Sequence, residues 1–143
     1  MSAQNYSNHV QRVPVFGIAM LILMLTAVGA IVNLVLSWGD HQRLYSASLI
    51  LVLSCCTVVI GGCARTFPLK VQDRAIRSEE NLRHYVLTGK LLDARLTPSQ
   101  IVALRFASDP EFVELAHHAA EKGMKPDDIK RAVRNWRADT YRA

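Results

Sequence analysis

Two long apolar runs dominate the pattern of hydrophobic and polar positions in the first half of the chain. Residues 13–38 and 44–64 contain no charged side chain, and only the polar residues 39–43 separate them. A helix needs about 20 consecutive apolar residues to cross the hydrocarbon core of a bilayer, and each run reaches that length. The pattern therefore predicts two transmembrane helices that form a hairpin.

Small and weakly polar side chains recur at helical spacing within each run. They are Thr26, Ala30, Asn33 and Ser37 in the first run, and Ala47, Ser54, Thr57 and Gly61 in the second. Small residues let helices approach closely inside a bilayer, and polar ones bond across the interface. We therefore expect the hairpin to pack through Ala30, Asn33, Ser54 and Gly61. Asn33 has two interpretations, a helix–helix hydrogen bond or a site in a pathway, and the hydrogen bond is favoured because polar groups in bilayers usually pair.

Residues 66–143 are rich in charged side chains and follow helical periodicity. Residues 97–100 and 108–111 have the composition of helix starts, whereas Gly89 and Gly123 fit helix ends. Pro68 disfavours helix at the preceding residue and removes a backbone donor, which predicts a kink or break. The predicted helices cover residues 69–87, 98–107, 110–122 and 126–141.

These patterns define the predicted fold and domains. The fold class is all-α: a two-helix transmembrane hairpin followed by a small cytoplasmic bundle of about four helices. The domains are a polar, partly ordered N-terminal tail at 1–12, the transmembrane hairpin at 13–65 and the helical cytoplasmic domain at 66–143. The last domain has 78 residues, near the lower limit for an independent hydrophobic core, so we expect the membrane or a partner to support it.

The distribution of charge predicts the orientation in the membrane. The loop at 39–43 carries one Arg and one Asp, whereas several basic residues follow the second run: Arg65, Lys70, Arg74, Arg77 and Arg83. The positive-inside rule places that basic segment in the cytoplasm, and two spans return the N-terminus to the same side. A cleaved signal peptide is the alternative for the first run. A membrane anchor is favoured, because only Arg12 precedes the run and no A-x-A-like site ends it.

Several motifs resemble those of an uncharacterised family of small bacterial membrane proteins. They are Gln4-x-Tyr6-x-Asn8-His9, Gln72-Asp73-Arg74-Ala75-Ile76-Arg77, Leu87-Thr88-Gly89-Lys90, Leu96-Thr97, Gln100-Ile101, Ala103-Leu104-Arg105-Phe106-Ala107-Ser108-Asp109 and Asn135-Trp136-Arg137-Ala138-Asp139. The likeness spans nearly the whole chain, and residues 72–109 are its most specific part. The resemblance implies a bacterial inner-membrane protein with two spans. It implies no activity, cofactor or catalytic residue, because the family is filed under a domain of unknown function.

Metal-binding patterns are weak in this sequence. His117 and His118 are adjacent and diverge on a helix, so a straight helix cannot direct both at one ion. A solvated or packing pair is favoured over a metal site, which usually needs three or four protein ligands. The three cysteines lie in the second apolar run and are interpreted as small packing residues: Cys55, Cys56 and Cys63. We predict neither a metal nor a cofactor.

Catalytic patterns are equally weak. The sequence contains no glycine-rich phosphate loop and no nucleophile elbow. Glu79 and Glu80 have two interpretations, an acid/base pair or surface partners of Arg83 and His84 one turn on, and the surface pairs are favoured. We therefore predict that the protein is not an enzyme.

The predicted last helix carries an apolar arc beside a basic one. The apolar arc contains Ile129, Val133, Trp136 and Thr140, so we expect Trp136 to be buried against the helix that carries Phe112 and Leu115. The basic arc, our candidate partner or lipid contact, contains Lys130, Arg134 and Arg137. It has three interpretations: contact with anionic lipid headgroups, contact with nucleic-acid phosphates by a helix-turn-helix module, or a solvated face.

The leading functional hypothesis is a membrane-anchored, non-enzymatic interaction protein. Its expected partners are the lipid bilayer and either a partner protein or a second copy of the chain. The alternative is a membrane-tethered nucleic-acid-binding regulator, which is disfavoured because any basic helix near a bilayer has the same pattern. An enzyme would require a cleft that gathers His84, Glu80 and the histidine pair.

Overall fold

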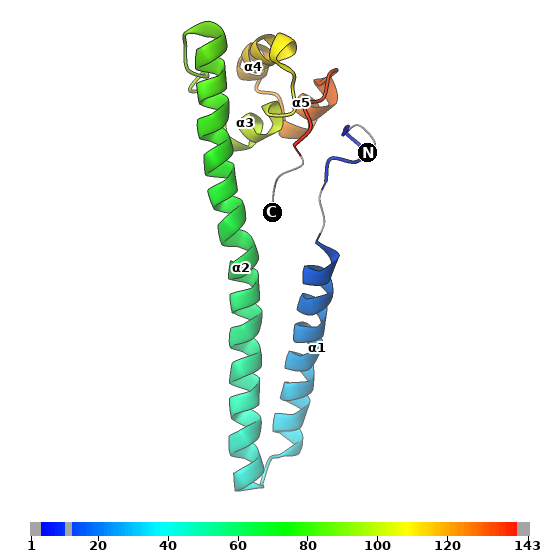
Figure 1. The fold of residues 1–143 in the computed structure, drawn as a ribbon. Coiled ribbons are helices and arrows are strands. Elements are labelled where there is room, and N and C mark those ends of the chain that lie inside the picture. Colours follow the sequence, from blue (N-terminus) through cyan, green and yellow to red (C-terminus); the bar gives the residue numbers. More distant parts are fainter. Residues whose placement is uncertain (1–3, 11–12, 140–143) are drawn as a thin grey trace. The chain divides into compact units, whose positions relative to one another are not determined.

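The computed structural model describes residues 4–10 and 13–139, and that part of the chain contains five helices (Figure 1). They are α1 (Pro14–Leu36), α2 (His41–Thr88), α3 (Pro98–Leu104), α4 (Asp109–Lys122) and α5 (Pro126–Ala132). The described residues form no strand, and a single isolated antiparallel bridge joins Ala107 to Trp136. The predicted all-α fold class is confirmed.

The described residues divide into two compact units. The first contains residues 13–67, which include α1 and the first part of α2. The second combines residues 68–139 with residues 4–10. Helix α2 contributes to both units because it is continuous over 48 residues.

In the first unit, the covered side chains of α1 recur every three or four residues. They are Phe16, Met20, Leu23, Ala27, Ala30, Leu34 and Ser37, and the covered positions of α2 include Leu44, Ala47, Leu51, Ser54, Val58 and Gly61. A repeat of 3.5 residues is typical of two helices that pack along a left-handed seam. A Cβ atom added at Gly61 would lie 2.7 Å from the Met20 sulfur, so side chains of the two helices meet along this seam.

The predicted packing residues do not all lie on that seam. Ala30 and Ser54 are buried, with 4% and 8% of their surface exposed, and Gly61 lies against Met20. Asn33 is exposed, and the structure differs here from the expected helix–helix role. The predicted stripe was drawn through polar side chains, whereas the seam follows the 3.5-residue repeat and takes the neighbouring Leu34 instead.

Helix α2 passes through Pro68 without interruption, so the predicted break and the separate helix from residue 69 are wrong. Proline removes one backbone donor and costs a helix about 3 kcal/mol or more. Because helical turns are present on both sides of Pro68, that cost is not enough to end the helix there. The predicted stop is confirmed, because α2 ends at Thr88 and Gly89 follows with a φ of +73°.

The short helices of the second unit begin and end at the predicted signals. The Gln100 side chain accepts a hydrogen bond from the Thr97 N–H at 2.7 Å, which completes a capping box, and Ser108 and Glu111 form a second one. Gly123 ends α4 in the left-handed conformation, with a φ of +58°. The largest side chains enclosed by α3, α4 and α5 are Phe106, Phe112, Leu104 and Ile129.

Helix α5 ends at Ala132, so the predicted helix from 126 to 141 is wrong beyond that residue. The Glu111 carboxylate accepts hydrogen bonds from the N–H groups of Arg134 and Asn135 at 3.1 and 3.0 Å. These bonds satisfy backbone donors that would otherwise bond within a continuing helix. The chain is therefore extended after α5. Thr140, expected on the apolar arc, lies outside the described residues.

Trp136 lies on this extended segment rather than on a helix. Its ring is half-buried, and its centroid lies 4.8 Å from that of Phe106. Its backbone forms the bridge to Ala107. The expected packing of Trp136 on the helix of Phe112 and Leu115 is thus replaced by a contact with the end of α3.

Candidate functional site

The N-terminal residues 4–10 dock on the second unit instead of forming a separate tail. The Tyr6 hydroxyl donates a hydrogen bond to Asp127 at 2.8 Å and accepts one from the Arg131 guanidinium at 3.1 Å. The Gln4 side chain accepts a hydrogen bond from the Asp139 N–H at 2.7 Å. The expected tail at 1–12 is therefore anchored at two points in its described part.

His9 adds an apolar contact between residues 4–10 and the rest of the second unit. It is 9% exposed, and its ring lies 5.7 Å from Phe106 and 5.6 Å from Trp136, measured between centroids. The Lys130 ammonium lies 3.3 Å from the His9 ring nitrogen Nε2. A histidine sandwiched in this way helps to cover the half-buried indole. We call residues 4–10 with this surface the N-terminal clasp.

A buried ion network joins α2 to the start of α4. Glu80 is 4% exposed and receives the Arg83 guanidinium at 2.9 Å. The same guanidinium lies 2.6 Å from Asp109 and donates to the Ala107 carbonyl at 2.7 Å. The predicted surface pairs Glu79 with Arg83 and Glu80 with His84 are wrong, because Arg83 turns inward between the two helices and takes Glu80 and Asp109 as partners.

The C-terminal segment joins this network. The second Glu80 oxygen lies 3.6 Å from the Arg137 guanidinium, and Arg105 pairs with Asp139 at 3.0 Å. A cleft of ~670 Å³ lies beside the network, lined by Glu79, Glu80, Arg83, Ser108, Asp109, Pro110 and Arg137. Both oxygens of Glu80 face guanidinium groups. This arrangement suits Glu80 to holding chain segments together rather than to accepting a proton from a substrate.

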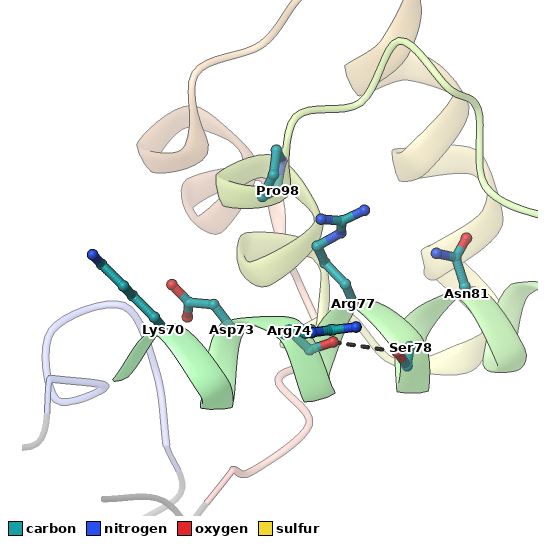
Figure 2. A pocket seen from close by; sticks show the side chains of 7 residues that line it. All are labelled: Lys70, Asp73, Arg74, Arg77, Ser78, Asn81 and Pro98. Atoms are coloured by element: carbon teal, nitrogen blue, oxygen red, sulfur yellow. Dashed lines mark hydrogen bonds between the residues drawn. The ribbon is translucent and has the colours of Figure 1, made fainter. Parts of the chain in front are cut away.

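A basic cleft of ~380 Å³ lies on another face of α2, where the helix leaves its apolar stretch. Figure 2 shows Lys70 and Arg77 extending from α2 on the side where Pro98 begins α3. Lys70, Arg74 and Arg77 follow at i, i+4 and i+7, so they share one helix face, and all three are exposed. With one carboxylate, Asp73, among three cations, this basic cleft carries a net positive charge suited to an anionic group.

The predicted basic arc of Lys130, Arg134 and Arg137 does not exist as a helix face. Only Lys130 lies on α5, where it is half-buried beside His9. Arg134 and Arg137 follow the end of that helix, and Arg137 is directed to Glu80. The shared helix face was wrongly predicted because a helix to residue 141 was assumed, and the expected contact of these residues with a partner or lipid stays a prediction. The basic residues that do share a helix face are Lys70, Arg74 and Arg77.

The two histidines of α4 are exposed and separate, as the sequence predicts. His117 lies 3.5 Å from Glu121, whereas His118 lines a shallow cleft with Glu114. No group of three or more metal-ligating side chains is present in residues 4–10 and 13–139.

Three carboxylates of the second unit, which we also call the helical unit, have lowered pKa values: Asp93, Glu111 and Asp127. Burial opposes ionisation of Glu111, but the N–H groups of Arg134, Asn135 and Ser108 together outweigh it and hold the pKa of Glu111 below its usual value. A hydrogen bond from the Arg95 side chain lowers the pKa of the half-buried Asp93 to about 2. The Asp93 shift follows from a bond within one loop, whereas the Glu111 shift depends on N–H groups 23 and 24 positions away.

A sequence model for a family of unknown function, DUF6526, matches residues 1–143. The chain belongs to this family. No curated protein and no solved structure matches the chain. The match to the family model confirms the part of the resemblance that placed the chain in a family of unknown function.

Sequence patterns alone missed the N-terminal clasp of this DUF6526 protein. The clasp uses seven residues without helical or strand periodicity, so no pattern of apolar positions signals it. The one available signal was the spacing Gln4-x-Tyr6-x-Asn8-His9, which belongs to the resemblance. In the structure, Gln4, Tyr6 and His9 each contact residues of the second unit between 68 and 139.

Proposed function

We propose that this DUF6526 protein is a membrane-anchored, non-enzymatic interaction protein of the bacterial inner membrane. Helix α1 and the apolar part of α2 span the bilayer as a hairpin. The helical unit, with both termini, lies in the cytoplasm and contacts the inner leaflet through Lys70, Arg74 and Arg77. The observation that carries the proposal is the position of this basic face shortly after the apolar stretch of α2, which ends at Ala64.

The length and exposure of the two helices support membrane insertion. By length and composition, α1 and α2 are both able to cross a membrane, with windows of mean hydropathy 2.7 and 2.3. Only 6% and 11% of those windows are buried, whereas a core helix of a soluble protein is mostly buried. Apolar surface of this extent needs lipid or a partner to cover it.

The N-terminal clasp supports the placement of both termini on one side of the membrane. Tyr6 precedes α1 and Asp127 follows α2, yet their side chains are hydrogen-bonded at 2.8 Å. Such a bond cannot form across a hydrocarbon core about 30 Å thick. If α1 and α2 both span the bilayer, the two residues share one side, and the basic residues after α2 indicate that this side is the cytoplasm.

The basic face suits lipid headgroups because of its distance from the apolar stretch. Lys70 and Arg77 lie six and thirteen residues after Ala64, the last residue of the apolar run, which is about 9 and 20 Å along the helix at 1.5 Å per residue. Lys70 is therefore close to the polar headgroups, and the long side chains of Arg74 and Arg77 extend the positive charge above the leaflet. Each basic residue near an anionic surface contributes about 1 kcal/mol to the attraction.

Lipid retention by the full chain tests this contact. The protein would be extracted in a mild detergent with anionic and zwitterionic lipids, and the bound lipids counted by native mass spectrometry. The triple variant Lys70→Gln, Arg74→Gln, Arg77→Gln is expected to lose anionic lipid selectively. The matched control Lys122→Gln, Lys125→Gln, Arg134→Gln removes three exposed charges elsewhere on the unit and should keep it. Equal retention by both variants would refute the leaflet contact.

The nucleic-acid alternative has less support than the lipid contact in the described residues. A recognition helix needs enough length to lie in the major groove, whereas α5 has seven residues and two of the three predicted phosphate contacts lie beyond it. Duplex DNA, offered to the same chain in nanodiscs at two salt concentrations, provides the test. Salt-sensitive DNA binding that the triple variant keeps would favour the alternative.

A further inference from the structure

The C-terminal part of α2 has one face that its own unit does not cover. Helices α3, α4 and α5 lie on one side of this part of α2 (Figure 1). The side chains of Ile76 and Glu80 on that side are buried, with 7% and 4% of their surface exposed. On a helical wheel, the opposite side carries Val71, Ala75, Ser78, Leu82 and Tyr85, all of them exposed, and of these Ser78 also lines the basic cleft beside Pro98 and Ala75 a cleft beside residues 137–139. We call these five residues the open face.

The open face has the spacing and composition of a coiled-coil seam. Its residues follow each other at four, three, four and three positions, which is the heptad repeat. None of the five is charged, although charged residues surround them in the sequence. Val71, Leu82 and Tyr85 leave 69%, 63% and 54% of their surface exposed. An amphipathic helix normally turns such a stripe toward a partner, not toward water.

The charges that flank the open face indicate what covers it. In the heptad register that places Ala75 and Leu82 at a, and Val71, Ser78 and Tyr85 at d, Arg74 is a g residue and Glu79 is the e residue of the next heptad. In a parallel pair, each g residue faces the e residue five positions on in the partner. Arg74 of each copy would thus meet Glu79 of the other. An antiparallel pair matches g with g and e with e, and so offers no such attraction.

Both flanking charges are available for that pairing. Arg74 and Glu79 are exposed, and neither takes part in any ion pair recorded within residues 4–10 and 13–139. Arg83, the expected helical partner of Glu79, is engaged with Glu80 and Asp109.

We infer that the open face of α2 binds a second copy of this chain in a parallel, two-fold symmetric helix pair. The apolar residues at a and d form its core, Ala75 and Ser78 let the helices approach, and two symmetric Arg74–Glu79 pairs fix the direction. A bilayer that holds both copies in the same orientation would align the helices and raise their effective concentration. The parallel direction itself follows from the charges. In the pair, Arg74 turns to Glu79 of the other copy and leaves the proposed lipid contact to Lys70 and Arg77.

Cysteine cross-linking in proteoliposomes tests the direction and the face. In full-length chain with Cys55, Cys56 and Cys63 replaced by Ala, we expect Val71→Cys and Tyr85→Cys each to give a disulfide dimer on mild oxidation. Asp73→Cys lies on the other side of α2 and serves as the matched control, expected to stay monomeric. An antiparallel pair would place residue 71 beside residue 82 of the other copy and not beside its own counterpart, so failure of each single variant to cross-link with itself overturns the proposal. Cross-linking of Asp73→Cys at an equal rate overturns it as well.

Charge reversal tests the partner. Donor- and acceptor-labelled chains in liposomes should show energy transfer that decreases on dilution with lipid. Arg74→Glu and Glu79→Arg each convert two attractions into two repulsions, so each should weaken association about tenfold. The double variant Arg74→Glu, Glu79→Arg should restore it, which a folding defect would not do. Absence of rescue, or unchanged transfer in both single variants, would overturn the pairing. A wild-type chain that stays monomeric at every ratio of lipid to protein would overturn the proposal. The open face would then be expected to bind a different protein.

Discussion

The Tyr6 hydroxyl lies 2.8 Å from one Asp127 carboxylate oxygen and 3.0 Å from the other, although 121 positions separate the two residues in the sequence. The phenol therefore bridges the N-terminal segment to α5, with the Arg131 guanidinium at 5.1 Å over its ring. This contact makes the segment before α1 part of the helical unit. Through it, the N-terminal clasp links the start of one apolar helix to the domain that follows the other.

Replacing Tyr6 with Phe should raise the pKa of Asp127 toward its ordinary value. The Tyr6 hydrogen bond is the main cause that holds the pKa of Asp127 below 3.8, and Arg131 adds a smaller effect. A lowered folded-state pKa stabilises the fold above the unfolded-state pKa, and this contribution is lost as the pH falls through the folded-state value. The measurement is a carboxyl ¹³C titration of the full chain in nanodiscs. Tyr45→Phe, whose exposed ring lies in the other unit, is the control. An unchanged Asp127 titration in Tyr6→Phe would contradict the bridge.

The proposed topology predicts which cysteines a membrane-impermeant thiol reagent labels in intact spheroplasts. The background is full-length chain with its three native cysteines replaced by Ala. Gln42→Cys lies in the first turn of α2, next to the short connection from α1, and should react from outside, because the proposed topology places that connection on the periplasmic side. Ser7→Cys and Lys122→Cys are exposed in the helical unit and should react only after lysis. The inverse labelling pattern would show that the orientation is the opposite of the proposed one. Labelling of Ser7→Cys but not of Lys122→Cys in intact spheroplasts would show that the two residues lie on different sides of the membrane, which the N-terminal clasp does not allow.

Much of the local structure was predictable because its causes are local. The Thr97–Gln100 and Ser108–Glu111 capping boxes form between residues three apart, so their sequence alone specifies them. The end of α5 was not predictable in this way. It depends on Glu111, which bonds the N–H groups of residues 134 and 135 from 23 and 24 positions away and competes with helix formation there.

The candidate site shows the same division between local and distant causes. Lys70, Arg74 and Arg77 share a face of α2 because of their spacing, which the sequence displays. Arg137 was assigned to a basic helix face, but its position is set by the extended segment and by Glu80, a partner on a distant helix. The pairing of Arg137 with Glu80 cannot be predicted from any periodicity in the sequence.

Gly61→Leu should weaken the packing of α1 on α2, whereas Gly62→Leu should not. A Cβ atom at Gly61 would lie 2.7 Å from the Met20 sulfur, but one at Gly62 meets nothing within 4 Å. Met20 ends in a flexible thioether that yields to a methyl group, so Gly61→Ala is expected to be mild. The larger Leu side chain forces the helices apart, and we expect a loss of about 1–3 kcal/mol. Thermal unfolding in detergent, followed by circular dichroism, compares the adjacent variants. Equal effects of the two Leu substitutions would mean that the seam does not pass through Gly61.

Glu111→Gln should destabilise the helical unit in a manner that depends on pH. The Glu111 carboxylate is half-buried and accepts hydrogen bonds from the N–H groups of Ser108, Arg134 and Asn135. A glutamine amide keeps one accepting oxygen but directs an NH₂ group at the remaining donors. Since hydrogen bonds to a charged group contribute more than neutral ones, we expect a loss of about 1–3 kcal/mol at neutral pH.

The sign of the pH dependence follows from the lowered pKa of Glu111. Its stabilising contribution is complete above the ordinary value of 4.5 and is lost as the pH falls through the lower folded-state value. The difference in unfolding free energy between wild type and Glu111→Gln should therefore be largest near neutral pH and shrink below about pH 4. Glu114→Gln changes an exposed residue of the same helix and should alter stability by no more than about 0.5 kcal/mol. A constant difference between wild type and Glu111→Gln across the acid range would show that the Glu111 charge does not hold residues 134 and 135 in their extended path.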